Sequence, residues 1–380
     1  MSGSDRRSTS DRRPTVGLAL IARDEEQTLP RLLASCDGAF DEVVLVDTGS
    51  QDATVDCFER WAAVQTATRC RVERFEWCDD FGRARQFADD QLATDWRVWA
   101  DCDDEIRGAS HLRDLAAAAD PELGAYFFAY DYAGGSDAPQ YLAKRERLVR
   151  TGRGRWVGAI HEVQEIQGTI TDVDPSLVLW VHHHDGSGRS SPGAPRAVRD
   201  LRVLEAEVRD DPYNRRAVFY LAQTHRDLGN IDHAIRYYDR RAEMGGWEEE
   251  AFYARYQAGV LRAQRGDWSE AMTTLVAAWE SRPTRLEPLH ELAWRLRVAG
   301  QHHAAHAFAR SGLDVPLPSD QLFVHRWVYV WGMRFEYSIA AYWAGDVRAA
   351  LAVCDELLAC EELPHQHRLD VLANRAFCRE

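Results

Sequence analysis

The segment EVVLVDTGSQD, residues 42–52, joins an apolar run to a polar turn. Its β-branched and leucine side chains predict a strand at residues 42–46 that is buried on both faces. Asp47 and Gly49 follow at once, and acidic residues and glycine are typical of a turn that ends a strand. We expect Asp52 to cap the helix that comes next. The segment therefore predicts a buried strand that delivers carboxylates to one edge of a sheet.

The same pattern continues on both sides of this segment. The continuous apolar run at residues 16–22 predicts a strand buried on both faces, and residues 71–75 and 96–100 predict two more strands. Between the strands, apolar residues recur at the i, i+3, i+4 and i+7 spacing of one helix face. These residues are Leu29, Leu32, Leu33 and Cys36, then Val55, Phe58 and Ala62, then Phe81, Ala84, Ala88 and Leu92. The alternation predicts an α/β domain with a mostly parallel sheet, whose ligands bind beyond the carboxyl ends of the strands.

A different pattern occupies the second half of the chain. Strand signals nearly vanish after the Gly-, Ser- and Pro-rich loop at residues 186–196. Glycines precede alanines by five residues in the pairs Gly229–Ala234, Gly266–Ala271, Gly300–Ala305 and Gly345–Ala350. The glycines lie 37, 34 and 45 residues apart, which brackets the tetratricopeptide period of about 34 residues and indicates an insertion before the last repeat. We predict an all-α tetratricopeptide-like solenoid, with large side chains such as Tyr237, Leu275 and Phe308 between the repeats.

The length of 380 residues fits two domains. We predict a disordered leader at residues 1–15, an α/β domain at 16–185, a linker at 186–196 and a helical domain at 197–380. The leader lacks the apolar centre of a secretory signal. The sequence contains no run of about 18 apolar residues, so we expect no membrane span.

The composition argues against some classes of binding partner and indicates a cellular compartment. The formal net charge of −15 would repel a phosphate backbone, which argues against sequence-independent nucleic-acid binding. The eight cysteines form no Cys-x-x-Cys pair, so we expect neither a zinc site of that type nor a disulfide framework. Reduced cysteines fit a cytoplasmic protein.

Acidic residues follow three of the predicted strands. Asp24 follows the first strand, Asp47 the second, and Asp101 and Asp103 the fourth. Carboxylates can accept hydrogen bonds from a base or a ribose, and two of them spaced by one residue can hold a divalent cation that binds a diphosphate. Without a cation the cluster would repel a diphosphate, so the pattern favours Mg²⁺ or Mn²⁺. Taken singly, Asp24 or Asp47 could equally be a helix cap or a turn residue.

The segments at the strand ends carry a resemblance to a known family. Residues 43–52 resemble the nucleotide-binding signature of glycosyltransferase family 2, and residues 80–86 with 101–104 resemble that family's path into its metal-binding Asp-x-Asp motif. The similarity covers residues 16–106 and weakens towards residue 184. It implies a glycosyltransferase A-type fold and an inverting, hexosyltransferase-type reaction. In that reaction a divalent cation helps to move a sugar from a nucleotide-sugar, in first place a UDP-sugar, to an acceptor hydroxyl.

The resemblance also implies which residues form the site. The nucleotide would be bound by Ala22, Asp24, Asp47, Gly49, Ser50, Asp52, Arg85, Asp101 and Cys102, with Arg85 near the diphosphate. The metal would be held by Asp101 and Asp103, and by His182 or His184, which share one face of a predicted strand. Two positions depart from the family pattern, because Gln86 replaces the usual Asn and Cys102 stands where Ala is common. Neither change removes a group that the chemistry needs.

An inverting transfer needs a carboxylate base near the acceptor hydroxyl. Glu162 is the candidate, since residues 156–162 resemble a segment that recurs after the Asp-x-Asp motif in bacterial members with tetratricopeptide tails. Asp131 and Asp185 are the alternatives. A surface glutamate at a strand end is an equally good interpretation of Glu162.

Two other functions fit parts of the pattern. The chain could be a tetratricopeptide adaptor with a non-catalytic nucleotide-binding domain, although retention of Arg85 and of the acidic residues at the strand ends (Asp24, Asp47 and Asp103) argues against decay. A nucleotidyltransferase also combines an α/β sheet with carboxylates, but it usually has an early Gly-rich loop with basic residues, which residues 23–26 do not provide. We expect the helical domain to present a protein or peptide hydroxyl as the acceptor. Homo-oligomerisation is the alternative role of this domain.

Overall fold

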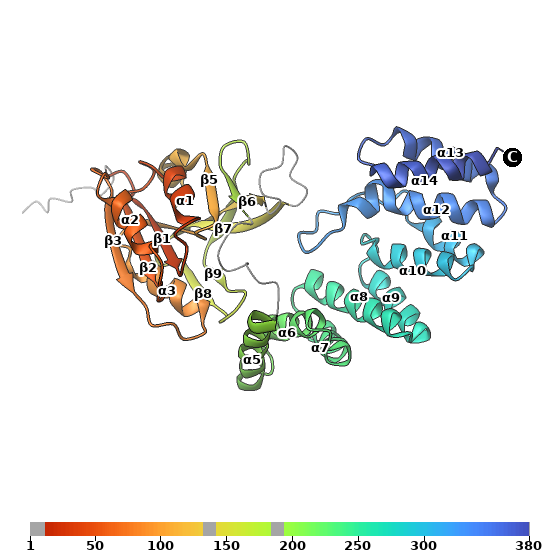
Figure 1. Cartoon of the computed structure of the whole chain (residues 1–380), viewed down its shortest axis with the longest axis horizontal. Coiled ribbons are helices and arrows are strands. Elements are labelled where there is room, and N and C mark those ends of the chain that lie inside the picture. The colour runs from red at the N-terminus through yellow and green to blue at the C-terminus, as the bar shows by residue number, and fades with distance from the viewer. Residues whose placement is uncertain (1–11, 132–141, 184–193, 380) are drawn as a thin grey trace, which may run out of the picture. The chain divides into compact units, whose positions relative to one another are not determined.

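The computed structural model describes residues 12–131, 142–183 and 194–379 (Figure 1). The chain folds into two compact units, Met1–Arg196 and Ala197–Glu380. Each unit contains its own cluster of buried apolar side chains. The first unit holds a sheet covered by helices and the second is entirely helical, so the predicted fold class is confirmed.

Residues 12–15, which fall within the predicted leader, contact the first unit. Thr15 donates its backbone N–H to the carboxylate of Asp95 at 2.7 Å, and the guanidinium of Arg12 donates to the same carboxylate at 2.7 Å. Residues 1–11 lie outside the described ranges. No helix in those ranges combines the length and the apolar character needed to cross a bilayer.

The first unit begins with regularly alternating strands and helices. These are β1 (Val16–Ala22), α1 (Leu29–Ser35), β2 (Glu42–Asp47), α2 (Thr54–Ala62), β3 (Arg69–Arg74), α3 (Phe81–Gln91) and β4 (Trp96–Ala100). All four predicted strands are present, and β3 begins earlier than predicted, at Arg69, which pairs with Glu42 of β2. The continuous apolar runs of β1 and β2 are buried as expected of central parallel strands.

The remainder of the first unit is richer in strands than the sequence pattern indicated. It contains β5 (Asp104–Arg107), η1 (Ala109–His111), α4 (Leu112–Ala118), β6 (Leu123–Asp131), β7 (Leu142–Arg150), β8 (Gly154–Val157), β9 (Val163–Ile166), β10 (Thr169–Asp172) and β11 (Leu179–His182). The main sheet has the order β3-β2-β1-β4-β7-β6-β11-β5, with β10 paired to β6. The first four strands are parallel, whereas β7 is antiparallel to β4 and β6. The sheet is therefore mixed, since the ten residues between β6 and β7 are fewer than the dozen or more that a parallel crossover requires.

The predicted cap of α2 is displaced by one residue. Ala53 occupies the N-cap position and provides no side-chain cap. The carboxylate of Asp52 instead accepts hydrogen bonds from the backbone N–H groups of Thr54 at 2.9 Å and Glu26 at 3.1 Å. Asp52 thereby joins the turn before α2 to the turn after β1.

The second unit consists of paired antiparallel helices. They are α5 (Ala194–Asp210), α6 (Arg215–Asp227), α7 (Ile231–Glu243), α8 (Glu248–Arg265), α9 (Trp268–Ser281), α10 (Glu287–Val298), α11 (His302–Ser311), η3 (Val328–Gly332), α12 (Met333–Trp343), α13 (Val347–Ala359) and α14 (His365–Phe377). The repeat glycines adopt positive φ angles at the turn within each pair, a conformation that favours glycine (Gly229, Gly266, Gly300 and Gly345). The alanines that follow them are fully buried (Ala234, Ala271, Ala305 and Ala350). The predicted repeat is therefore confirmed.

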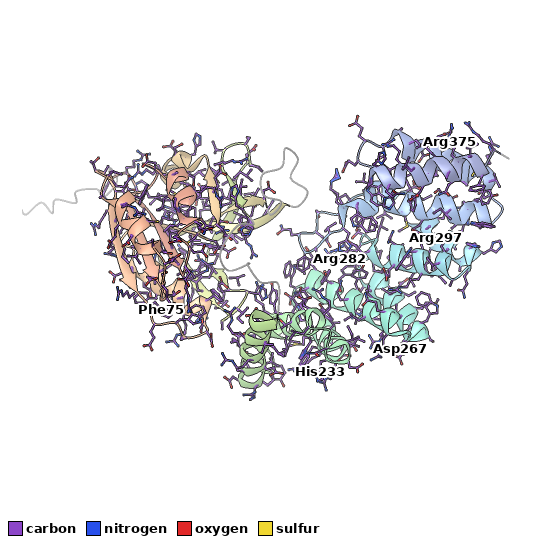
Figure 2. All side chains as sticks on the ribbon, viewed as in Figure 1. Phe75, His233, Asp267, Arg282, Arg297 and Arg375 are labelled. Atoms are coloured by element: carbon purple, nitrogen blue, oxygen red, sulfur yellow. The ribbon has the colours of Figure 1, made fainter. Side chains whose placement is uncertain are left out.

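The predicted insertion lies between α11 and η3, and part of it folds back onto α8 and the connection between α9 and α10. Glu249 accepts the backbone N–H groups of residues 321 and 322 at 2.7 and 2.8 Å. Arg285 donates to the carbonyl oxygens of residues 322 and 323 at 3.2 and 3.1 Å. Arg282, labelled in Figure 2, forms two hydrogen bonds with the carboxylate of Asp320 at 2.5 and 2.7 Å. The insertion is thus an integral part of the helical unit.

Candidate functional site

The turns that follow β1 and β2 are joined by hydrogen bonds. Thr48 donates its backbone N–H to the carbonyl oxygen of Ala22 at 2.9 Å. The backbone N–H of Asp24 donates to the hydroxyl of Ser50 at 3.1 Å, and the carboxylate of Asp24 accepts the N–H of Gln51 at 2.7 Å. Asp24 has a φ of 56°, an uncommon conformation for a residue with a side chain. The predicted nucleotide residues of both turns therefore form one continuous structure.

Asp47, Gly49 and Asp52 shape this structure from the β2 side. The carboxylate of Asp47 is buried and accepts the backbone N–H of Ser50 at 2.9 Å, while Gly49 has a φ of 109°. Partial burial alone would raise the pKa of Asp52, but hydrogen bonds, first of all from the Thr54 hydroxyl, lower it. Asp52 is therefore ionised at neutral pH, and hydrogen bonds hold both Asp47 and Asp52 in position.

The turn after β4 brings together a second group of acidic residues. Asp103 Oδ1 and Asp104 Oδ1 each lie 3.5 Å from His182 Nδ1 at the end of β11. One potential ligand atom from each of these three residues lies within 4.8 Å of the others. Carboxylate and imidazole donors at this spacing fit a divalent cation such as Mn²⁺. Asp103 and His182 are thus brought together as predicted, whereas His184 lies outside the described residues.

Asp101, also predicted as a metal ligand, is not a member of this group. Its Oδ1 accepts a hydrogen bond from Arg85 Nη2 at 2.6 Å. In place of Asp101 the structure contributes Asp104, which the sequence analysis did not select. A period-2 pattern could have indicated it, because Asp104 shares a strand face with the buried Ile106 on β5.

The two neighbouring carboxylates have opposite electrostatic surroundings. Burial, followed by the negative charges of Asp101 and Asp104, raises the pKa of Asp103 to about 6. Burial also acts to raise the pKa of Asp101, but the Arg85 guanidinium outweighs it and holds that pKa at about 2. The turn therefore carries more negative charge than its arginines neutralise, and a bound cation would relieve the excess.

Arg85 connects this turn to the predicted base. Arg85 Nε donates to Glu162 Oε1 at 2.6 Å, and the guanidinium lies over the rings of Trp99 and Trp156, at 4.5 and 5.3 Å from their centroids. Arg85 is 7% exposed. The structure thus places Arg85 between Asp101 and Glu162, and its predicted contact with a diphosphate stays a prediction.

Close packing of α3 against the β8–β9 connection sets this contact. A Cβ atom at Gly82 would lie 2.4 Å from the carbonyl oxygen of Gly158. The backbone N–H of Phe81 donates to the carbonyl oxygen of Ala159 at 2.8 Å. Only glycine at residue 82 allows α3 to approach the segment that carries Glu162 so closely.

The remaining predicted residues differ in how the structure places them. Asp131 ends β6 and is 2% exposed. Cys102 is buried, and burial raises the pKa of its thiol well above the ordinary value, so the thiol is not an ionised nucleophile. Asp185 lies outside the described residues.

Comparison with known proteins agrees with this arrangement. Residues 18–176 match the model of the family described as Glycosyl transferase family 2. A TPR repeat-containing protein of Synechococcus elongatus is 26% identical over 73% of this chain and 69% of its own length. The SPbeta prophage-derived glycosyltransferase SunS of Bacillus subtilis is 20% identical over 59% of this chain, which spans about half (52%) of SunS.

Among solved structures, S. aureus TarS 1–349 in complex with UDP-GlcNAc is 14% identical, with a TM-score of 0.43 over 71% of this chain and 92% of that chain. The sequence matches, the sheet of the first unit and the repeats of the second agree with one another. The first unit of the chain therefore belongs to glycosyltransferase family 2, and a tetratricopeptide-like helical domain follows it.

Proposed function

We propose that this protein is a metal-dependent, inverting glycosyltransferase that moves a sugar from a nucleotide-sugar, in first place a UDP-sugar, to an acceptor hydroxyl. The observation that carries the proposal is the position of Asp103. Its carboxylate lies beside His182, has a raised pKa and follows β4, which is the neighbour of β1 in the sheet. A cation site next to a nucleotide site is the combination that departure of a nucleoside diphosphate requires.

The turns after β1 and β2 supply the nucleotide side of the proposal. Asp24, Asp47 and Asp52 are acceptors for the hydroxyl and N–H groups of a nucleoside, and Gly49 and Ser50 form the turn between them. Asp103 and His182 would hold the divalent cation. Asp101 lies in the same turn, and its negative charge would add to the attraction for the cation. When bound, Mn²⁺ or Mg²⁺ neutralises the negative charge that develops on the leaving diphosphate.

Glu162 is the proposed base that accepts the proton of the acceptor hydroxyl. Its side chain is only 13% exposed and is held by Arg85. The contact with Arg85 orients the carboxylate before substrate arrives, and a base must lie within hydrogen-bond reach of the proton that it accepts. Asp131 and Asp185 stay as alternatives.

We propose a protein or peptide side-chain hydroxyl as the acceptor, presented by the helical domain. Tetratricopeptide-like solenoids offer extended surfaces to polypeptide partners, which supports this class of acceptor. Homo-oligomerisation through the helices is the alternative role, and a cytoplasmic location is part of the same proposal.

Incubation of the full chain with a panel of UDP- and GDP-sugars, with Mn²⁺ or with EDTA, tests the proposed reaction. We expect slow, Mn²⁺-dependent hydrolysis of one donor without any acceptor. Nucleotide binding without hydrolysis would favour the non-catalytic adaptor. Release of pyrophosphate from a nucleoside triphosphate and a sugar phosphate would favour the nucleotidyltransferase.

A further inference from the structure

Asp104 is grouped with Asp103 and His182 by distance, but its carboxylate is already engaged by the protein. Asp104 Oδ1 accepts a hydrogen bond from the Tyr130 hydroxyl at 2.7 Å. Asp104 Oδ2 accepts the backbone N–H of Asp101 at 3.0 Å and lies 3.3 Å from Arg147 Nη2. Both oxygens of Asp104 therefore have partners inside the fold.

Asp103 is different in this respect. Within the described part of the chain, its carboxylate approaches His182 but receives no hydrogen bond and has no arginine partner. Asp104 is fully buried, whereas the side chain of Asp103 is 17% exposed. A cation arriving from solvent would therefore meet Asp103 and not Asp104.

The partners of Asp104 are themselves fixed in place. Arg147 is 1% exposed, donates to the carbonyl oxygen of Trp99 at 3.2 Å, and lies 3.6 Å from the centroid of the Trp99 ring. Tyr130 contacts His182 Nδ1 at 3.0 Å through the same hydroxyl that donates to Asp104. Since a carboxylate cannot donate, the Tyr130 proton goes to Asp104, and the imidazole Nδ1–H donates to the Tyr130 oxygen. Nε2 of His182 is then the ring nitrogen that could bind a cation.

We propose that Asp104 is a positioning residue and not a metal ligand, and that it acts with Arg147 and Tyr130 to hold the two ligands Asp103 and His182. Through the N–H of Asp101, Asp104 closes the turn that carries Asp103. Through Tyr130 it sets the orientation of the His182 ring. The proposal rests on the cation site proposed above and assigns roles within it.

The arrangement predicts a graded response to substitution. Groups that orient metal ligands typically change metal affinity about 10–100-fold when removed, whereas loss of a ligand carboxylate removes a bond to the metal itself. Asp104→Asn keeps one acceptor oxygen but loses the second acceptor and the negative charge opposite Arg147. Phe at residue 130 loses only the hydroxyl that connects Asp104 to His182.

The test measures Mn²⁺ affinity of the full chain by calorimetry without donor, and transfer or donor hydrolysis as Mn²⁺ is raised. We expect Asp104→Asn and Tyr130→Phe to weaken Mn²⁺ binding about 10–100-fold and to regain turnover at saturating Mn²⁺. Asp103→Asn should lose Mn²⁺ binding and should not regain turnover. Tyr126→Phe is the matched control, because Tyr126 lies on the same strand and its hydroxyl donates to the distant carbonyl oxygen of Leu115 at 2.9 Å.

A double variant that restores the charge balance distinguishes loss of positioning from loss of folding. Asp104→Asn leaves a buried Arg147 without its carboxylate, so the double variant Asp104→Asn/Arg147→Gln should unfold at a higher temperature than Asp104→Asn alone. Equal and complete loss of Mn²⁺ binding in folded Asp104→Asn and Asp103→Asn would overturn the proposal and make Asp104 a ligand. So would unchanged Mn²⁺ affinity in Tyr130→Phe. A wild-type chain that binds no Mn²⁺ would instead refute the proposed cation site.

Discussion

Both units bury arginines beside carboxylates, but the charges balance in only one of them. In the helical unit, the fully buried Arg285 forms two hydrogen bonds of 3.0 Å with Glu287 and one of 3.2 Å with Asp320. Arg241 likewise donates to Glu250 at 2.5 Å. Each buried carboxylate of these clusters has an arginine, as expected where ion pairs serve the fold.

The site of the first unit instead has more carboxylates than arginines, since Arg85 is shared by Asp101 and Glu162. Arg85 neutralises Asp101, and Arg147 lies against Asp104. Asp103 has no arginine partner in the described residues, and burial, followed by the negative charges of Asp101 and Asp104, raises its pKa. The comparison singles out Asp103, the carboxylate that is left over after the ion pairs are assigned, as the candidate cation ligand, which the acidic motif alone does not do.

Removal of the excess carboxylate should give the largest effect. Asp103→Ala should lower donor hydrolysis and transfer on the order of 10³-fold, because the cation contributes several kcal/mol to stabilising the leaving diphosphate. Without metal, Asp103→Ala should be at least as stable as the wild type, because the variant removes one of several neighbouring negative charges. Activity assays with Mn²⁺ and thermal unfolding measure both effects. Asp90→Ala, an exposed acidic residue of α3, is the control; activity that survives in Asp103→Ala or in EDTA would contradict the metal-dependent mechanism.

Removal of an arginine that is paired with a buried carboxylate should destabilise the helical unit. Arg285→Met should destabilise the helical unit by about 3–5 kcal/mol, because Glu287 would be left buried without its partner. Urea unfolding measures this loss, and Mn²⁺ affinity should stay unchanged. Arg326→Met is the matched control, since its pair with Glu362 is exposed and should contribute about 1 kcal/mol or less. Equal effects of the two variants would show that burial does not distinguish the pairs.

Substitution of the proposed base should separate donor binding from the chemical step. Glu162→Gln should lower transfer at least a hundredfold, because it removes the proton acceptor, and should spare donor binding. Calorimetry with the donor nucleotide and steady-state kinetics separate the two. Arg85 would keep its hydrogen bond to Asp101 in this variant. Full turnover would place the base elsewhere, with Asp131 and Asp185 next.

The smallest effect concerns pH. Mn²⁺ must displace the proton of Asp103, so Mn²⁺ affinity should fall about tenfold per pH unit below about 6 and level off above it. Because the pKa of Asp103 is raised in the folded state, that group stabilises the metal-free protein at low pH and its contribution is lost as pH rises through about 6. Asp103→Asn should remove this part of the dependence, while that of Asp89, whose pKa burial also raises to about 6, remains. An Mn²⁺ affinity that is constant from pH 5 to 8 would contradict the assignment.

The sequence by itself determined the parallel half of the sheet, the solenoid and the acidic residues at the strand ends. These features depend on local patterns: continuous apolar runs, helical spacing, and a glycine that must adopt a positive φ five residues before a buried alanine. Asp24, Asp47 and Asp103 follow strands in the sequence, so parallel pairing of β1, β2 and β4 was enough to bring their turns to one edge.

Only the tertiary structure decided which acidic residue keeps an uncompensated charge. Arg147 reaches Asp104 because β7 pairs antiparallel with β4, and Tyr130 and His182 meet because β6 and β11 are neighbours. No periodicity in the sequence specifies these pairings, since each depends on which strands bury their faces together. The acidic turn could therefore be predicted from the chain, whereas the division of its residues into a partly exposed Asp103 without an arginine in the described residues, an arginine-paired Asp101 and a buried Asp104 could not.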